Sequence, residues 1–143
     1  MIQQAEIILV EDSISDADLV MRALKKNNLV NRVLHLQDGQ EALEYFFGDS
    51  EESMVTAPKL ILLDLKMPKI NGLEVLEKLK SNESTKVIPV VILTSSREDP
   101  DLEKCYLLGA NSYVVKPVVF DEFIKAIAEV GLYWLLVNVA AKK

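Results

Sequence analysis

Short apolar runs alternate with longer amphipathic stretches along the whole chain. The runs are three or four residues long and nearly free of polar positions, which is typical of strands buried on both faces. They predict strands at 7–10, 33–36, 60–63, 90–93 and 113–115, of which 33–36 has the weakest pattern. Runs of this kind favour a parallel sheet that is covered by helices on both sides.

The stretches between the runs predict helices, because their apolar residues recur at intervals of three or four. The predicted apolar faces are Ala17, Val20, Met21 and Leu24; Ala42, Leu43, Phe46 and Phe47; Leu73, Leu76 and Leu79; and Leu102, Cys105 and Tyr106. Gly48 and Gly109 end the second and fourth helices, and a fifth helix begins near Val119. The polar, acidic segment 48–57 is expected to be an exposed loop. The pattern therefore describes five strand–helix units.

Composition narrows the functional classes. The chain has 143 residues, half of them hydrophobic, which fits one domain with a packed core. Its net charge of -6 argues against a nucleic acid or an anionic membrane surface as partner. The longest apolar run, 132–137, is too short to cross a bilayer, and no secretion signal is evident. With a single cysteine, Cys105, these features predict a cytoplasmic protein.

Polar residues stand at the ends of four predicted strands. Glu11 and Asp12 follow the first, Asp64 the third, Thr94 the fourth and Lys116 the fifth. A carboxylate at the end of a buried strand is costly unless it is paired, bound to a metal or placed at an open edge. Sites in parallel sheets form at the carboxyl ends of the strands, so we expect these side chains to lie together.

Together these residue types suit phosphoryl transfer. An aspartate such as Asp64 can act as a nucleophile toward phosphorus. Glu11, Asp12 and Asp64 could hold Mg²⁺, which prefers oxygen ligands and keeps several waters. Lys116 could pair with the phosphoryl charge, and the hydroxyl of Thr94 could donate a hydrogen bond to it.

Simpler interpretations exist for each residue taken alone. Acids beside strands are commonly solvated or cap helices, and Ser13 or Asp16 could cap the first helix. Tyr113 alone is typical of a half-buried strand aromatic. The single histidine, His35, has no second histidine near it and fits a packed or surface residue better than a ligand. The combination of Asp64 and Lys116 at matching strand ends favours a site.

In these strand-end residues and in the segments around them, the chain resembles bacterial response regulator receiver domains over almost its whole length. Thr94 lies 30 residues after Asp64, and Lys116 lies 22 after Thr94, which are usual spacings in that family. The resemblance implies a flavodoxin-like, doubly wound α/β fold with a five-stranded parallel sheet in the order 2-1-3-4-5. The matching segments are 7–12, 63–68, Asn71-Gly72, 93–95, 109–111 and 113–117.

By this resemblance Asp64 is the phosphoacceptor. Asp12 would bind Mg²⁺ directly and Glu11 mostly through water, and the backbone carbonyl of Lys66 would be a further ligand. Lys66 stands where many receivers have a neutral amide, and Ser96 is small. Residues at both positions flank the site in this family and influence dephosphorylation, so we hypothesise that Lys66 and Ser96 set the lifetime of the phosphoryl group.

The resemblance also implies a conformational switch. Thr94 would move toward the phosphoryl group, and Tyr113 would turn into the vacated space, which would alter the face formed by the fourth helix, fifth strand and fifth helix. The Lys116–Pro117 bond is expected to be cis.

The end of the chain carries apolar residues on two helical faces, the first from Phe120 to Leu135. The second face includes Val130, Tyr133, Leu136 and Val137. A helix that is apolar on two faces predicts a homodimer through an extended last helix, with an interface formed by Tyr133, Trp134, Leu136 and Val137. The alternative is additional packing within the chain.

These features predict a stand-alone receiver domain that spans 1–143, without an output domain. The resemblance implies that the protein accepts a phosphoryl group from a sensor histidine kinase and is a signalling protein, not an enzyme. The longer segment before the third strand and the Tyr133-Trp134-Leu135-Leu136 ending resemble the small regulators paired with bacteriophytochrome kinases. A phosphorylation-independent interaction module on the same fold is the alternative. An aspartyl phosphatase would commonly carry a second aspartate at the position of Lys66, and a flavodoxin-like cofactor binder would need a phosphate-binding loop, which the sequence lacks.

Overall fold

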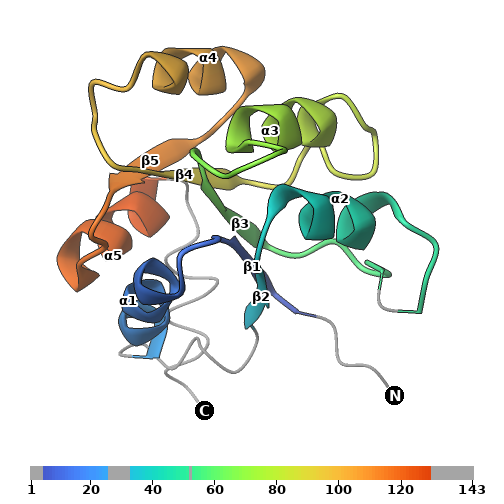
Figure 1. The fold of residues 1–143 in the computed structure, drawn as a ribbon, viewed down its shortest axis with the longest axis horizontal. Coiled ribbons are helices and arrows are strands. Elements are labelled where there is room, and N and C mark those ends of the chain that lie inside the picture. Colours follow the sequence, from blue (N-terminus) through green and yellow to red (C-terminus); the bar gives the residue numbers. More distant parts are fainter. Residues whose placement is uncertain (1–4, 26–32, 52, 130–143) are drawn as a thin grey trace.

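Strands and helices alternate along the computed structural model, which describes residues 5–25, 33–51 and 53–129 (Figure 1). The predicted strands are present, with β3 and β4 one residue longer at their carboxyl ends and β5 beginning one residue earlier. The elements are β1 Ile7–Val10, α1 Ile14–Lys25, β2 Val33–Leu36, α2 Gly39–Phe47, β3 Leu60–Asp64, α3 Gly72–Lys80, β4 Val90–Thr94, α4 Pro100–Leu108, β5 Ser112–Val115 and α5 Phe120–Glu129.

The sheet is parallel, and its strands lie in the order β2-β1-β3-β4-β5, as expected for the receiver fold. Val10 of β1 is aligned with Leu36 of β2 and with Leu63 of β3. Because the strands are in register, the residues that follow them reach the same edge of the sheet. The register thus brings the chain after Val10 close to Asp64.

The strands β1, β3 and β4 bury alternate side chains on opposite faces of the sheet. Ile61 and Leu63 of β3 pack under α2, α3 and α4, whereas Leu60 and Leu62 pack against α1 and α5. Figure 1 shows these two helical layers on either side of the sheet. A fully buried leucine or isoleucine contributes about 1.5 to 3 kcal/mol, so this double core holds the strand ends in fixed positions.

The close approach of α3 to β3 depends on Gly72. A side chain at this position would collide with the carbonyl oxygen of Asp64 and would reach within 2.8 Å of the Cα atom of Leu65. The amide of Gly72 donates a hydrogen bond to the carbonyl of Leu65 at 3.0 Å. Asn71 and Glu74 form a capping box that starts α3 at this point. The first residue of α3 is therefore in direct contact with the last residue of β3.

The segment after α2 is only partly the exposed loop that its composition predicts. Residues 49–51 and 55–57 are exposed, but Ser53 is buried. The Ser53 hydroxyl donates to the carbonyl of Glu44 at 3.1 Å, and the amide of Met54 donates to that of Tyr45 at 2.7 Å. The loop thus folds back onto the end of α2, where it supplies a partner for the carbonyl of Tyr45 and a second one for the carbonyl of Glu44, which also accepts from the amide of Gly48 at 2.9 Å.

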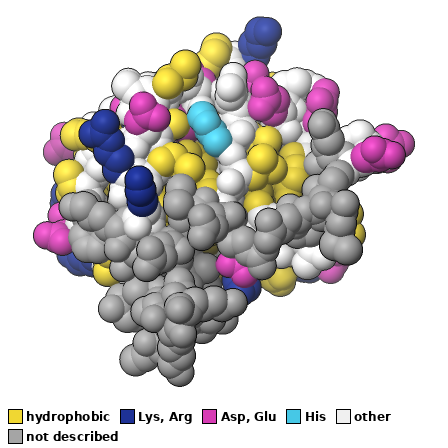
Figure 2. All heavy atoms as spheres, turned by 90° about the horizontal axis from the view of Figure 1, so that it is seen from below, with side chains coloured by type: hydrophobic (Ala, Val, Ile, Leu, Met, Phe, Trp, Pro, Cys, Tyr) yellow, Lys and Arg dark blue, Asp and Glu magenta, His cyan; other side chains and the backbone are white. Residues whose placement is uncertain are grey.

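The side of the molecule that holds α1 and β2 mixes apolar, acidic and basic side chains (Figure 2). The strand β2 is an edge strand, and Val33, Leu34 and His35 in it are only half-buried. In the described part of the chain, we find no helix with the length and apolar character that a membrane span requires.

Candidate functional site

Lys116 lies at the centre of a cluster of carboxylates at the carboxyl edge of the sheet. Its Nζ atom is 2.9 Å from Oδ1 of Asp64, 3.2 Å from Oε1 of Glu11 and 3.1 Å from Oδ2 of Asp16. The residues Glu11 and Asp64 are 0% and 1% exposed. A single cation thus faces three carboxylates, two of which have almost no contact with solvent.

This crowding shifts the acidity of the central pair. Burial raises the pKa of Asp64 to about 7, a rise that the hydrogen bond from Lys116 opposes and the charge of Glu11 reinforces. Burial alone would lower the pKa of Lys116, but its hydrogen bond to Asp64 and the charges of Asp64 and Glu11 raise that pKa above its ordinary value. Lys116 therefore stays charged, while the carboxyl of Asp64 gains from a further positive charge.

A bound metal ion could supply this positive charge, with the carboxylates of the cluster as its ligands. Glu11, Asp12 and Asp64 each offer a carboxylate oxygen within 4.8 Å of the other two. The Oδ2 atom of Asp64 is buried and has no hydrogen-bond partner among the described residues. A buried carboxylate oxygen without a partner is costly, and a hard divalent cation with oxygen ligands would satisfy it. The donor set fits Mg²⁺, and the carbonyl of Lys66 stays a predicted ligand.

Thr94 stands at the end of β4 beside the cluster, with 1% of its surface exposed. Its hydroxyl donates to the carbonyl of Ser96 at 3.0 Å and accepts from the Ser96 amide at 3.3 Å. The Thr94 carbonyl accepts a 2.7 Å hydrogen bond from the amide of Lys116. The backbone of Thr94 is thus fixed next to Lys116, while its hydroxyl is held in its own turn.

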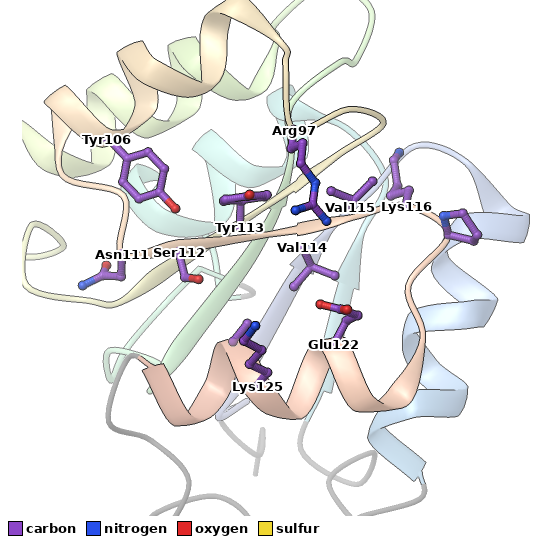
Figure 3. A pocket seen from close by; sticks show the side chains of 12 residues that line it. Arg97, Tyr106, Asn111, Ser112, Tyr113, Val114, Val115, Lys116, Glu122 and Lys125 are labelled. Atoms are coloured by element: carbon purple, nitrogen blue, oxygen red, sulfur yellow. The ribbon is translucent and has the colours of Figure 1, made fainter.

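Tyr113 lines a pocket of about 530 Å³ along the edge strand β5. Figure 3 shows Arg97, Tyr106 and Tyr113 around this pocket, with Glu122 and Lys125 reaching it from α5. The rings of Tyr106 and Tyr113 lie edge to face with centroids 6.3 Å apart. Lys116 also lines the pocket, so the predicted switch residue Tyr113 and the lysine of the acidic cluster share it.

Lys66 extends from the end of β3 toward the start of α4. Its Nζ atom is 3.4 Å from Oδ2 of Asp101 and 3.7 Å from Oδ2 of Asp99, the residue that caps α4. The hydrogen bond to Asp101 and the charge of Asp99 raise the pKa of Lys66. Its side chain is 60% exposed, so each ion pair contributes little to stability. The role in phosphoryl lifetime stays a prediction.

Sequence reasoning missed two residues of this site. Asp16 was considered only as a cap, whereas the hydroxyl of Ser13 caps α1 by accepting from the amide of Asp16 at 3.2 Å, and Asp16 itself pairs with Lys116. A third acid close to Glu11 and Asp12 in the sequence was the available signal. His35 contacts the carbonyl of Glu11, and nothing in the sequence pattern indicated this contact. The Lys116–Pro117 bond is cis, as expected.

Comparison with known proteins agrees with this arrangement. The profile of the response regulator receiver domain family matches residues 7–128. The probable methanogenesis regulatory protein FilR2 of Methanothrix harundinacea is 40% identical over 90% of this chain and 83% of its own length. The response regulator Rcp1 of Synechocystis sp. is 37% identical over 90% of this chain and 88% of its own.

Solved structures extend the similarity to three dimensions. The bacteriophytochrome response regulator RtBRR is 45% identical, with a TM-score of 0.84 over 95% of this chain and 83% of its own. A phosphorylated cyanobacterial phytochrome response regulator, RcpA, is 34% identical, with a TM-score of 0.76 over 93% and 95% of the two chains. A Mn²⁺-bound form of Rcp1 is 35% identical, with a TM-score of 0.72 over 92% and 94%.

Proposed function

Because this chain belongs to the response regulator receiver domain family, as a homologue of phytochrome response regulators in two-component signalling, we propose that Asp64 accepts a phosphoryl group from a sensor histidine kinase. The observation that carries the proposal is the state of Asp64: its carboxyl is buried, one oxygen contacts Lys116 and the other has no partner among the described residues. Receiver domains are signalling proteins rather than classical enzymes, so the phosphorylated protein is itself the output.

The reaction follows from the positions of the side chains. A carboxylate oxygen of Asp64 attacks phosphorus, the new O–P bond forms as the P–N bond of the kinase phosphohistidine breaks, and the imidazole leaves with the electron pair. Lys116, held 2.9 Å from Asp64, pairs with the phosphoryl charge. Mg²⁺ held by Glu11, Asp12 and Asp64 would supply further neutralisation of that charge. The Mn²⁺-bound and phosphorylated relatives support this assignment.

The test uses a small phosphodonor in place of the kinase. We expect the intact mass of the protein to increase by one phosphoryl group in the presence of Mg²⁺ and acetyl phosphate, and not when EDTA is added first. If no increase occurs and no beryllofluoride complex forms with Mg²⁺, the phosphoacceptor role is wrong and the phosphorylation-independent interaction module becomes the better account.

The proposed switch starts at Thr94. Its hydroxyl donates to the carbonyl of Ser96, so a contact with the phosphoryl group requires the side chain to leave this turn. Tyr113, half-buried at the edge of its pocket, would then turn toward the space that Thr94 leaves. The two movements would change the surface formed by α4, β5 and α5, and with it the binding of partners.

The remaining assignments rest on the relatives. Similarity to a bacteriophytochrome response regulator supports a bacteriophytochrome as the cognate kinase. That the protein is a stand-alone receiver and lies in the cytoplasm stays a prediction from its sequence. The absence of nucleic acid and membrane as partners stays a prediction from charge and hydropathy.

The predicted homodimer is a separate proposal, because Tyr133, Trp134, Leu136 and Val137 lie outside the described residues. We expect the wild-type protein to sediment as a dimer at micromolar concentration, because the sequence predicts a helix that is apolar on two faces. Trp134→Glu should shift the equilibrium to monomer, since it places a charge in the predicted interface. A monomeric wild-type protein, with and without beryllofluoride and Mg²⁺, would contradict the dimer.

A further inference from the structure

His35 connects the edge strand β2 to the acidic cluster. Its Nε2 atom lies 2.8 Å from the backbone carbonyl oxygen of Glu11. A carbonyl oxygen only accepts hydrogen bonds, so Nε2 must carry the proton, which both the neutral Nε2–H tautomer and the imidazolium provide. The single cyan side chain at the surface in Figure 2 is this histidine.

The backbone and side chain of Glu11 are held from several directions. Its amide donates to the carbonyl of Leu36 at 3.0 Å, which continues the pairing of β1 with β2 by one residue. One carboxylate oxygen accepts from the amide of Ser13 at 3.2 Å, and the other accepts from Lys116, also at 3.2 Å. The bond from His35 adds the carbonyl, which belongs to the peptide group between Glu11 and Asp12.

Asp12 differs from Glu11 in having little support of its own. It is exposed, and no described residue forms a hydrogen bond or an ion pair with its carboxylate. Its direction therefore depends on the orientation of the preceding peptide plane, since the backbone fixes where Cβ points. His35 is the side chain that fixes this plane from the carbonyl side.

We propose that His35 is a positioning residue of the metal site, which orients the Glu11–Asp12 peptide so that Asp12 points to the ion. The inference rests on the proposed Mg²⁺ site. Groups that orient metal ligands commonly change metal affinity by about tenfold or more when they are replaced. A contact that only supported packing of β2 would change stability and leave metal affinity unaltered.

The experiment compares donor-bearing and donor-free side chains at position 35. Calorimetric titration of the full chain with Mg²⁺ should give a dissociation constant about tenfold higher for His35→Phe than for the wild type, because the ring shape remains and the donor is lost. His35→Gln should bind Mg²⁺ nearly as well as the wild type, since its amide can donate to the same carbonyl.

Leu34→Ala is the matched control. Leu34 is half-buried on the same edge strand, packs against the core and is aligned with Ile8 of β1. This variant should have a lower thermal midpoint and an unchanged Mg²⁺ dissociation constant. If it weakens Mg²⁺ binding as much as His35→Phe does, affinity follows the stability of β2 and the positioning role is overturned.

The remaining outcomes separate this inference from the proposed function. Wild-type affinity in His35→Phe would overturn the positioning role and leave the metal site intact, whereas a wild-type protein that does not bind Mg²⁺ would overturn both. If His35→Phe does not fold, NMR of the wild-type imidazole decides: a protonated Nε2, with a change in the Asp12 amide signal on Mg²⁺ addition, supports the role. An unprotonated Nε2 overturns it.

Discussion

Replacement of Asp64 by asparagine is expected to abolish phosphoryl uptake and, in the same protein, to stabilise the metal-free fold. The amide of asparagine is not a nucleophile toward phosphorus, so no increase in mass should follow incubation with Mg²⁺ and acetyl phosphate. Intact mass spectrometry of Asp64→Asn beside the wild type measures this directly.

The gain in stability follows from the raised pKa of Asp64. The folded value of about 7 exceeds the ordinary 3.8, so the folded state binds the proton more tightly than the unfolded state. As pH rises from about 4 to 7, the wild type loses stability because its carboxyl must ionise in a buried position. Asparagine carries no such cost, so Asp64→Asn should be more stable by about 2 kcal/mol at pH 8 and by much less at pH 5. Urea unfolding in EDTA at both pH values tests the sign.

Asp38→Asn serves as the control for this change. Asp38 caps α2 by accepting from the amide of Glu41 at 2.8 Å, and asparagine caps helices equally well. This variant should accept a phosphoryl group and unfold like the wild type. Phosphoryl uptake in Asp64→Asn would show that another carboxylate is the acceptor.

Replacement of Lys116 by methionine should destabilise the protein and slow its phosphorylation. The change removes the cation from the buried carboxylates of Glu11 and Asp64 and leaves their charges uncompensated. Removal of one partner from a buried ion pair costs about 3 kcal/mol. We also expect phosphorylation by acetyl phosphate to slow on the order of a hundredfold, since a donor to the transferred group is lost.

The loss of stability in Lys116→Met should depend on pH. The hydrogen bond from Lys116 lowers the pKa of Asp64, so this pKa should exceed about 7 in the variant. Ionisation of a carboxylate whose folded pKa is raised lowers the free energy of unfolding as pH rises, and the higher pKa in Lys116→Met makes this loss larger than in the wild type. The difference in stability between the two proteins should therefore be larger at pH 8 than at pH 5. Unfolding by urea at these two pH values, in EDTA, is the measurement.

Lys59→Met is the matched control for the lysine. Lys59 forms a 3.2 Å ion pair with Glu6 whose side chains are 40% and 33% exposed, and a pair of this kind contributes less than about 1 kcal/mol. Equal destabilisation in Lys59→Met and Lys116→Met would mean that burial of the carboxylates is not the cause.

The strand ends were predictable from the sequence because two simple rules meet there. Apolar runs locate buried parallel strands, and parallel strands place their carboxyl ends at one edge. These two rules were enough to predict that Asp64 and Lys116 lie close together, since each residue directly follows such a run. The strand order itself came from resemblance to the receiver family and is confirmed by the structure.

The contacts of Asp16 and His35 were not predictable in this way. Asp16 reaches Lys116 through the direction in which α1 leaves the sheet, and that direction depends on the turn formed by Ser13. His35 reaches Glu11 because β2 is an edge strand, so a side chain there can bend over the strand end. Both contacts depend on the angle between elements, to which hydrophobic periodicity is insensitive.

The contact at Gly72 has a mechanical consequence for signalling. Since α3 begins directly against the carbonyl of Asp64, with no side chain between them, a displacement of the helix start is transmitted to Asp64 without any intervening flexible group. A protein that binds the exposed side of α3 could therefore alter how fast Asp64 reacts without contacting the carboxylates around Lys116. Conversely, phosphorylation of Asp64 would displace the start of α3, which would be a second route of communication besides the proposed switch of Thr94 and Tyr113.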